Sequence, residues 1–516
     1  MIIYDTVTTI VSRFINVVDP LRAARYVQQR EFFKRAYIAA KSTTSDGLWK
    51  TPRTSGAQEN VLAQDAVVAR ARDLARNNPY IVGARRRFRA CTIGEGIWPR
   101  PKILKKKKAH RFDFEKETIE DILYRWEKWA PVAGANGDSI YQCQRVACNH
   151  FFDDGQVLIR KRMTRQYPFL QIEVLECDHL DKSKDREVGK NQNRIVGGIE
   201  LDGFNRPLFY HLKTRHPSEV QSDTEKVPAS EIIHLFDRQR ASDVTGITGY
   251  ASVVQSIFRL NEYAYSTMDA ARLTNHFAVW IESPYVNEFG ETVSGETGTS
   301  SDPQERYKHI SPAAFHYGLP GEKPHTIRPE NPGSQYDPFM TREIQTCSVG
   351  TGVSYEAMSH DGSRTNFAGS RQLQLLERAY SRISQSIFQE QMHAKIYAWF
   401  IETEVSFSEP GTPKLRMPDF DRDKQRYLRV AWNRPVQEWV DPQKDAKARQ
   451  LRIQMNNSTE TAEAEDMGLD IEEIYATKAY ENEIKRKLGL PVMTPEQREE
   501  EEPRPALVQE EKEDAE

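Results

Sequence analysis

The order of helical segments in the second half of the chain constrains its fold more than any other feature. Residues 249–283 carry apolar side chains at three- and four-residue steps, as an amphipathic helix does. A segment rich in proline and glycine covers residues 284–338, and the helical pattern resumes over 339–353. A polar segment follows at 354–371, and the longest helical pattern covers 367–403. The sequence therefore predicts two helices joined by a compact insert, then a loop, then a long helix.

The polar segment has the sequence SYEAMSHDGSRTNFAGSR. Its content of Gly, Ser, Asp and Asn is too high for a helix or a packed core, so we predict an exposed loop between two helices. A loop presented in this way either touches something that passes it or grips a partner. The candidate contact residues are Ser359, His360, Ser363, Arg364, Thr365 and Asn366.

The long helix that follows the loop is predicted to be on the order of 50 Å long, at about 1.5 Å per residue. A helix of this length suits an elongated subunit that packs against neighbours better than an isolated globule. We predict that its apolar residues form one stripe, made up of Leu373, Leu376, Tyr380, Ile383, Ile387, Met392, Ile396 and Phe400.

The first half of the chain mixes helices and strands. Helical patterns cover residues 60–90, with a break at Asn77-Asn78-Pro79, and then about 113–130 and 139–152. From Gly155 to Phe236 the pattern is typical of strands, and a DGFNRP turn indicates a hairpin. A final helical region covers about 421–490, so the predicted fold class is α+β and mainly helical.

Charge is distributed unevenly along the chain, whose formal net charge is −3. Residues 496–516 contain ten acidic and three basic side chains, a net of −7, and are predicted to be a disordered tail. Between Arg85 and Arg111, eleven Lys and Arg side chains face one acid, Glu95. This run either meets nucleic acid or an acidic face of another subunit, or is simply a solvated surface. Its candidate contact residues are Arg85, Arg86, Arg87, Arg89, Lys105, Lys106, Lys107 and Lys108.

The cysteines and the hydropathy of the sequence indicate in which cellular compartment the chain is expected. The five cysteines have no repeated spacing, which favours a reduced setting over a disulfide framework. The N-terminus has no cationic start followed by an apolar run, so a signal peptide is not expected. No segment approaches the roughly 20 apolar residues that span a bilayer, and we expect a soluble protein without membrane contact.

Motifs for catalysis are absent from the sequence. There is no GxxxxGK[ST], GxSxG, HExxH or GxGxxG, which argues against the commonest ATPase, hydrolase, zincin and dinucleotide-binding classes. Two acidic clusters could hold Mg²⁺ as nucleases do, although both also suit turns beside strands. They consist of His150, Asp153 and Asp154, and of Cys177, Asp178, His179 and Asp181. We favour the turn interpretation and predict no metal, no cofactor and no enzyme activity.

Several stretches, in this order along the chain, resemble the portal proteins of the lambda-type family of tailed phages. The resemblance covers about residues 36–490, and its weight lies in the order of the stretches, since each is weak alone. The stretches are RARDLARNNPYIVGARRRF, TIGEGIWPRP, GGIELDGFNRPLFYHL, VPASEIIHLFDR, TGITGYAS, HDGSRTNFAGSRQLQLLE, WNRPVQEWVDPQKDAKA and MGLDIEEIYATKAYENE.

The resemblance implies a portal fold of wing, stem, clip and crown, assembled as a ring of typically twelve subunits. The implied parts are an N-terminal segment 1–35, a wing 36–248, a stem helix 249–283, a clip 284–338, a second stem helix 339–353, a tunnel loop 354–371, the long helix 367–403, a C-terminal wing or crown 404–490 and the acidic tail 491–516. In such a ring the tunnel loop lines the narrowest part of the DNA channel.

The implied function is passage of viral double-stranded DNA through that channel, during packaging into the capsid and ejection from it. The implied partners are other copies of the chain, DNA, the terminase large subunit, the major capsid protein and scaffold, and the head–tail adaptor. The subunit would reside in the virion at the portal vertex, and in the host cytoplasm during assembly. Short polar loop residues suit weak, sequence-independent phosphate contact, and Asp361 adds repulsion. The alternatives are a Mg²⁺-dependent nuclease or packaging enzyme, and a DNA-binding scaffold protein without a channel.

Overall fold

The structure is a computed structural model, and ten segments of the chain are described in it. They are residues 54–105, 114–186, 193–218, 223–275, 279–282, 315–318, 333–363, 366–407, 413–435 and 442–491. The chain divides into two compact units, Met1–Ser55 and Gly56–Glu516, and the elements below belong to the second. Some predictions therefore concern residues outside the described part, namely the segment 1–35, most of the insert 284–338, the tail beyond residue 491, Lys106, Lys107, Lys108, Arg364 and Thr365.

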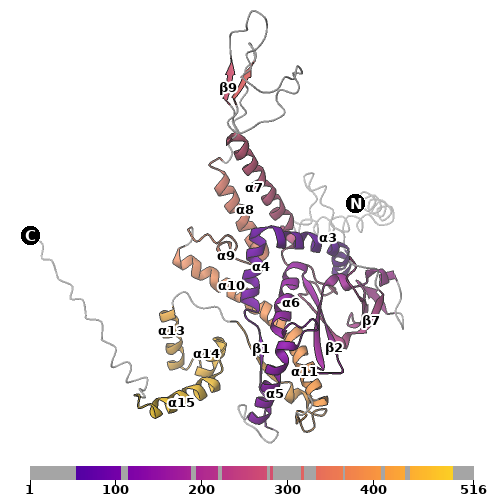
Figure 1. The fold of residues 1–516 in the computed structure, drawn as a ribbon, viewed down its shortest axis with the longest axis vertical. Helices are drawn as coiled ribbons and strands as arrows, with labels where there is room; N and C mark the ends of the chain where they lie inside the picture. Colours follow the sequence, from indigo (N-terminus) through magenta and orange to yellow (C-terminus); the bar gives the residue numbers. More distant parts are fainter. Residues whose placement is uncertain are drawn as a thin grey trace, which may run out of the picture. The chain divides into compact units, whose positions relative to one another are not determined.

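Three helices, α3 (Gly56–Asn77), α4 (Pro79–Thr92) and α6 (Ile140–Asp154), pack against one another (Figure 1). The predicted break between α3 and α4 is confirmed at Asn78. Its side-chain oxygen accepts hydrogen bonds from the backbone N–H groups of Tyr80 and Ile81, at 3.0 and 3.1 Å. Pro79 then starts α4, where its missing N–H costs no helical hydrogen bond.

Two antiparallel sheets follow α6. The first has the strand order β3 (Leu170–Leu175), β2 (Gln156–Met163), β8 (Ile232–Phe236). The second has the order β4 (Arg194–Val196), β5 (Ile199–Leu201), β6 (Pro207–Lys213), β7 (Thr224–Pro228). The predicted hairpin joins β5 to β6, and its turn is held by Asp202, whose Oδ1 accepts the N–H groups of Phe204 and Arg206 at 2.8 Å each.

Gly155 joins α6 to β2 and can only be glycine. Its φ is +79°, and a Cβ atom there would lie 2.0 Å from the backbone carbon of Ile247. Asp153 and Asp154 are accordingly the last two residues of a helix that ends at a left-handed glycine.

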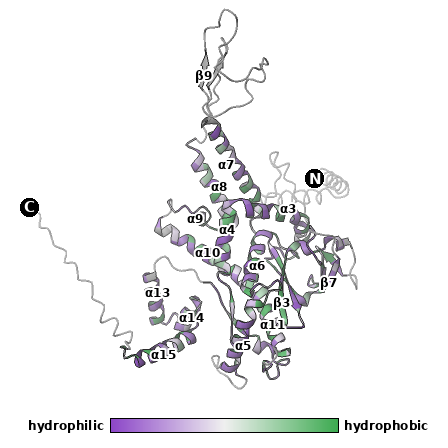
Figure 2. Cartoon of the chain, in the orientation of Figure 1, coloured by the Kyte–Doolittle hydropathy of each residue, from purple (hydrophilic) through white to green (hydrophobic). Residues whose placement is uncertain are grey.

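The largest core lies between the first sheet and the helices α5 (Lys116–Trp129), α6 and α11 (Ala394–Ser406). In Figure 2, α11 and β3 are largely hydrophobic, in agreement with that position. A small sheet of β1 (Trp98–Pro101) and β11 (Val430–Asn433) borders this core. Trp98 pairs with Asn433, which lies 335 residues later in the chain, so the C-terminal part of the chain helps to close the N-terminal core.

The long helix is confirmed, but a π-turn interrupts it. The segment consists of α10 (Phe367–Phe388), the π-turn Gln389–His393, and α11. The predicted single apolar stripe is wrong, because the two halves have different surroundings. Met392, Ile396 and Phe400 are fully buried, whereas Leu376, Tyr380 and Ile383 are 51%, 59% and 61% exposed.

His393, in that π-turn, is 3% exposed and packs against the ring of Trp432 at 5.5 Å. Burial lowers the pKa of His393 from 6.5 to about 3, so the folded chain keeps it neutral while the unfolded chain protonates it below pH 6.5. The stability that neutral His393 provides is therefore complete above pH 6.5 and is lost progressively toward pH 3.

We expect His393→Phe to lose less stability than the natural chain when both are moved from pH 7.5 to pH 5. The difference should be about 2 kcal/mol, because pH 5 lies about 1.5 units below the pKa of 6.5 in the unfolded chain and each unit corresponds to about 1.4 kcal/mol. Urea unfolding at the two pH values measures it. Equal losses in the two chains would show that His393 does not titrate on unfolding.

Two further helices pair beyond the first core. Helices α7 (Val254–Asn275) and α8 (Tyr336–Thr351) contact each other through Leu260, Met340 and Ile344 (Figure 1). The predicted bounds 249–283 and 339–353 differ from these. The first helix starts later than predicted, after a 3-10 turn at Ala251–Val253. The predicted helical range also includes strand β9 (Val279–Glu282), whose β-branched and aromatic residues favour strands. Strand β9 pairs in parallel with β10 (Phe315–Gly318).

The C-terminal part is helical, as predicted, and hydrophilic (Figure 2). It consists of α12 (Lys424–Tyr427), α13 (Pro442–Gln454), α14 (Glu460–Asp466) and α15 (Ile471–Lys487). No residue of α15 is buried, and α14 is tied to α10 by ion pairs from Arg378 and Arg382 to Asp466. None of the helices in the described segments is long and apolar enough to span a bilayer.

Candidate channel loop and its supports

The loop between α8 and α10 starts at a helix end that fixes its direction. Gly352 takes the left-handed conformation at φ +71°, and its N–H donates to the Ser348 carbonyl at 3.0 Å. The Ser348 hydroxyl then donates to the Val353 carbonyl at 2.6 Å. The chain therefore leaves α8 in a defined direction.

A short helix, α9 (Tyr355–Ser359), occupies the first part of the loop. The prediction that this segment carries no helix was wrong there. Ser354 caps α9 by accepting the Ala357 N–H at 3.3 Å, and Met358 is buried at 3% exposure in the core formed with α3, α4 and α7. Met358, the one fully buried residue of SYEAMS, was the signal in the sequence.

Helix α4 approaches the loop closely at Gly83. A Cβ atom at this position would lie 3.3 Å from the carbonyl oxygen of Met358, so the glycine allows α4 and α9 to pack backbone to backbone. Between α4, α9 and α10 lies a cavity of about 550 Å³, whose lining includes Arg86, His360 and Gln374.

Glu377 on α10 fastens the base of the loop. Its carboxylate accepts the Ser354 N–H at 3.0 Å and the Arg87 Nη2 at 2.8 Å, and it is 7% exposed. Burial by itself would raise the pKa of Glu377, but the hydrogen bonds from Ser354 and Arg87 lower it below its ordinary value. Glu377 was not among the predicted site residues, because nothing near it in the sequence marks it.

The tip of the loop is exposed and organised by one aspartate. Asp361 Oδ1 accepts the N–H and the hydroxyl of Ser363 at 3.0 and 2.6 Å, and Oδ2 accepts the Tyr355 hydroxyl at 3.0 Å. His360 takes the left-handed conformation at φ +55° and is exposed, as are Gly362 and Ser363. The loop thus has an anchored base and an exposed polar tip.

The other predicted loop residues have different positions. The Ser359 hydroxyl donates to the Tyr355 carbonyl at 2.7 Å, inside α9, so it serves the helix. Asn366 is exposed and caps α10 by accepting the Gly369 N–H at 2.7 Å.

In the described part of the chain, the predicted basic run is divided between a helix and a strand. Arg85, Arg86, Arg87 and Arg89 lie on α4, Arg100 lies in β1, and Lys105 follows β1. Arg85 pairs with Asp153 at 2.8 Å and Arg87 with Glu377, so both neutralise acids within the chain. Arg86 and Lys105 are exposed, and Arg89 is half-buried.

The exposed half of α10 borders an apolar groove. The groove has a volume of about 770 Å³ and is open along α4, α6, α8 and α10. Val349 on α8 is 85% exposed. Four large apolar side chains of α10 are between 46% and 61% exposed, namely Leu375, Leu376, Tyr380 and Ile383. An apolar stripe of this size is typical of a contact surface.

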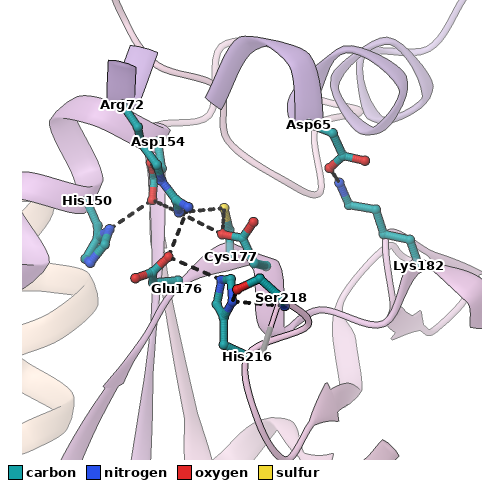
Figure 3. A network of polar contacts seen from close by, with 10 residues as sticks. Asp65, Arg72, His150, Asp154, Glu176, Cys177, Lys182, His216 and Ser218 are labelled. Atoms are coloured by element: carbon teal, nitrogen blue, oxygen red, sulfur yellow. Dashed lines mark hydrogen bonds and ion pairs between the residues drawn. The ribbon is translucent and has the colours of Figure 1, made fainter. Parts of the chain in front are cut away.

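Arg72 pairs with one acid of each of the two clusters that could have held Mg²⁺, namely Asp154 and Asp178. Figure 3 shows Arg72 beside Asp154. Arg72 on α3 donates from Nε and Nη2 to both oxygens of Asp154, at 2.7 Å each, and Asp154 is 0% exposed. Nη2 also lies 2.7 Å from Asp178, and Nη1 lies 3.0 Å from Glu176. His150 Nδ1 lies 2.9 Å from Asp154 Oδ2. The guanidinium takes the central place of the cluster, where a cation would otherwise bind.

The pKa values of this cluster agree with a charge-paired arrangement. Burial alone would lower the pKa of Arg72, but the hydrogen bond and charge of Asp154 raise it above its ordinary value. Burial alone would raise the pKa of Asp178, and Arg72 lowers it. Glu176, Asp178 and His216 have ligand atoms within 4.8 Å of one another, yet Arg72 already contacts both carboxylates.

The other predicted chemical groups have structural partners. His179 Nδ1 lies 2.9 Å from the Lys213 carbonyl oxygen, and Asp181 accepts hydrogen bonds from Ser183 and Thr224. All five cysteines are buried free thiols.

These elements define an α+β framework that holds a polar loop between helices. Residues 42–385 match the model of the family described as "Phage portal protein, lambda family". The chain belongs to this family, as its sequence stretches predicted.

Two relatives have the same classification in their names, and the chain also has a limited structural similarity to chains of two solved particles. The chain is 23% identical over 479 residues to the "Probable portal protein" of Halomonas phage phiHAP-1, covering 89% of this chain and 88% of that protein. It is 20% identical over 329 residues to the "Portal protein" of Escherichia phage N15, covering 60% and 62%. A chain in "Neck of native GTA particle computed with C12 symmetry" has a TM-score of 0.41 at 12% identity, with 79% of this chain and 99% of that chain covered. A chain in "Virion of native gene transfer agent (GTA) particle" has a TM-score of 0.38 at 11% identity, with 80% and 99% covered.

Proposed function

We propose that the chain is one subunit of a ring at a capsid vertex, and that double-stranded DNA passes through the ring during packaging and ejection. Membership of the portal family supports this proposal, as do the names of the two relatives. The resemblance described above implies that the ring has typically twelve subunits.

The structural observation that carries the channel role is the contrast within the loop. Its base is fixed by Glu377, Arg87 and the buried Met358, while His360, Gly362 and Ser363 at the tip are exposed. In a ring, a fixed base would hold the tip of every subunit at the same distance from the ring axis. The tip offers the Ser363 hydroxyl and the His360 imidazole, which can form weak phosphate contacts that DNA can leave again, and the Asp361 carboxylate, which repels phosphate.

The apolar surface of α10 supports assembly from several copies. Leu376, Tyr380 and Ile383 would cost free energy if they remained in water, and a second copy covering them removes that cost. We assign this surface to the contact between neighbouring subunits.

The remaining partners belong to the same proposal. The insert 284–338 would dock the terminase large subunit and later the head–tail adaptor, and the wing would meet the major capsid protein and scaffold. The subunit would then be a virion component. The paired arginines of the acidic clusters make a Mg²⁺-dependent nuclease the weaker alternative.

Electron microscopy of the purified chain tests the ring and the α10 surface together. We expect rings with a central hole, and we expect Tyr380→Asp to reduce the fraction of assembled subunits about tenfold or more, because a charge enters a desolvated contact. Tyr124→Asp is a matched control, since Tyr124 on α5 is 54% exposed and Tyr380 is 59% exposed.

A natural chain that stays monomeric under all conditions would contradict the ring. If the Tyr380→Asp variant forms rings at the same yield as the natural chain, the proposal of a ring still holds. The assignment of α10 to the contact between subunits would then be wrong.

A further inference from the structure

Helices α13, α14 and α15 form a C-terminal arm, and its described contacts with the body of the chain (the described residues up to Pro435) are polar. Arg449 on α13 lies 3.9 Å from Glu463 on α14, and the Tyr475 hydroxyl on α15 donates to Glu460 on α14. No residue of these three helices belongs to the apolar cores of the described segments. Without apolar burial against the body, the position of the arm depends on its polar contacts.

Asp466, the last residue of α14, makes the shortest ion pairs between the arm and the body. Arg378 Nη2 lies 2.8 Å from Asp466 Oδ2, and Arg382 Nη2 lies 2.5 Å from Oδ1. Both arginines lie on α10. The side chain of Asp466 is 33% exposed and that of Arg382 is 47% exposed, so water and salt reach the contact.

The contacts that follow along the chain have the same polarity, since cations of the body face acids or carbonyl oxygens of the arm. They join Arg100 to the carbonyl oxygens of Gly468 and Leu469, Lys102 to Asp470 at 3.8 Å, and Lys116 to Glu472 at 3.6 Å. The segment Asp466–Glu472 therefore lies on a row of five cations. Partly exposed ion pairs are weak individually and are screened by salt, so a contact built from them can open.

Asp466 also covers a group of three arginines. A cavity of about 20 Å³ is lined by Arg378, Arg382 and Arg434, and Asp466 is the one acid in its lining. Guanidinium groups bind carboxylate and phosphate oxygens through the same N–H donors. Since one water molecule occupies about 30 Å³ of liquid, a phosphate group can reach these arginines only when Asp466 has left.

We propose that the segment Asp466–Glu472 is a reversible electrostatic latch, and that the three arginines beneath it bind a phosphate group of duplex DNA when the arm has moved away. In the closed state the Asp466 carboxylate occupies the place that the phosphate takes in the open state. DNA as the source of the phosphate rests on the proposed function, whereas the latch is a property of the single chain.

Energy transfer between two fluorophores measures the opening of the latch. The fluorophores are attached at Tyr124→Cys on α5 and Thr477→Cys on α15 of the full-length chain, at exposed positions, and its own five cysteines are buried. We expect the transfer to fall when NaCl is raised from about 0.1 M to about 1 M, because the screening length drops from about 10 Å to about 3 Å. At about 0.1 M NaCl, a short duplex DNA of arbitrary sequence should lower the transfer as well, since its phosphates compete with Asp466.

Asp466→Asn tests the place of the phosphate. We expect this variant to show low transfer already at low salt and to bind the duplex about tenfold more tightly than the natural chain, because the competing carboxylate is gone. Glu465→Gln is the matched control, since Glu465 is an exposed acid on the same helix and its replacement removes the same charge. It should change neither readout. Adding Arg382→Gln to Asp466→Asn should remove most of the gain in DNA affinity.

Energy transfer that stays constant between the two salt concentrations would overturn the latch. If salt opens the arm but Asp466→Asn binds DNA no more tightly than Glu465→Gln, the arginines do not bind phosphate and that part of the proposal is wrong. Both readouts come from the single chain, so a failure to form rings would contradict the proposed function and not the latch.

Discussion

Replacing Arg72 by methionine should destabilise the second unit by about 3–5 kcal/mol, the usual cost of removing one partner of a buried ion pair. The variant leaves Asp154, which is 0% exposed, without its guanidinium, and it also removes the cation between Glu176 and Asp178. Arg72 joins α3 to the end of α6 and to the turn after β3, so helices and sheets lose a shared support (Figure 3). Equilibrium unfolding in urea, followed by far-UV circular dichroism, measures the change.

Two further variants separate the buried charge from ordinary loss of an arginine. Arg240→Met removes a pair with Glu59 in which both side chains are about half exposed, and it should cost about 1 kcal/mol or less. Arg72→Met combined with Asp154→Leu should recover part of the lost stability, since no unpaired charge then remains at that position. If Arg72→Met costs no more than Arg240→Met, the Arg72 cluster is not a stabilising centre.

The order of elements could be predicted from the sequence because it depends on local signals. Helical periodicity gave the two helices before the loop and the long helix after it, and the Asn78-Pro79 break and the β5–β6 hairpin follow from capping and turn chemistry. The bounds of α7 were less accurate, since α7 covers Val254–Asn275 and the predicted range was 249–283.

The partners of charged residues could not be predicted in the same way. Arg72 and Asp154 are 82 residues apart in the chain, and Arg87 and Glu377 are 290 apart. Local sequence therefore showed a pair of acids and a run of bases, each resembling a binding surface. Only the fold brings Arg85 to Asp153 and Arg87 to Glu377, where the charges neutralise each other.

The α10 stripe shows a related limit. Spacing predicts which side chains share a helix face, but not what covers that face along its length. Ile396 is buried against the first sheet, whereas Ile383, about three and a half turns earlier on the same helix, is 61% exposed. The exposed part is where the proposed neighbour would pack.

A lysine at the loop tip should impede DNA passage without disturbing the subunit. Gly362 is exposed, its φ is not positive, and a Cβ atom there would meet nothing within 4 Å, so Gly362→Lys fits without strain. We expect a change in unfolding free energy within about 0.5 kcal/mol, as for other surface substitutions. In a ring, every subunit would contribute one added positive charge close to the phosphates, and each such contact strengthens DNA binding and its dependence on salt.

The expected result is normal ring formation with packaged DNA per particle reduced by about tenfold, partly restored as the salt concentration rises. Gly362→Ser is the matched control, because it adds a side chain of similar polarity to its neighbours and no charge, and it should package normally. Failure of Gly362→Lys to form rings would identify the tip as a joint between subunits. Normal packaging by Gly362→Lys would mean that DNA does not pass close to the tip, and the channel role of the loop would then be wrong even though the chain remains a member of the portal family.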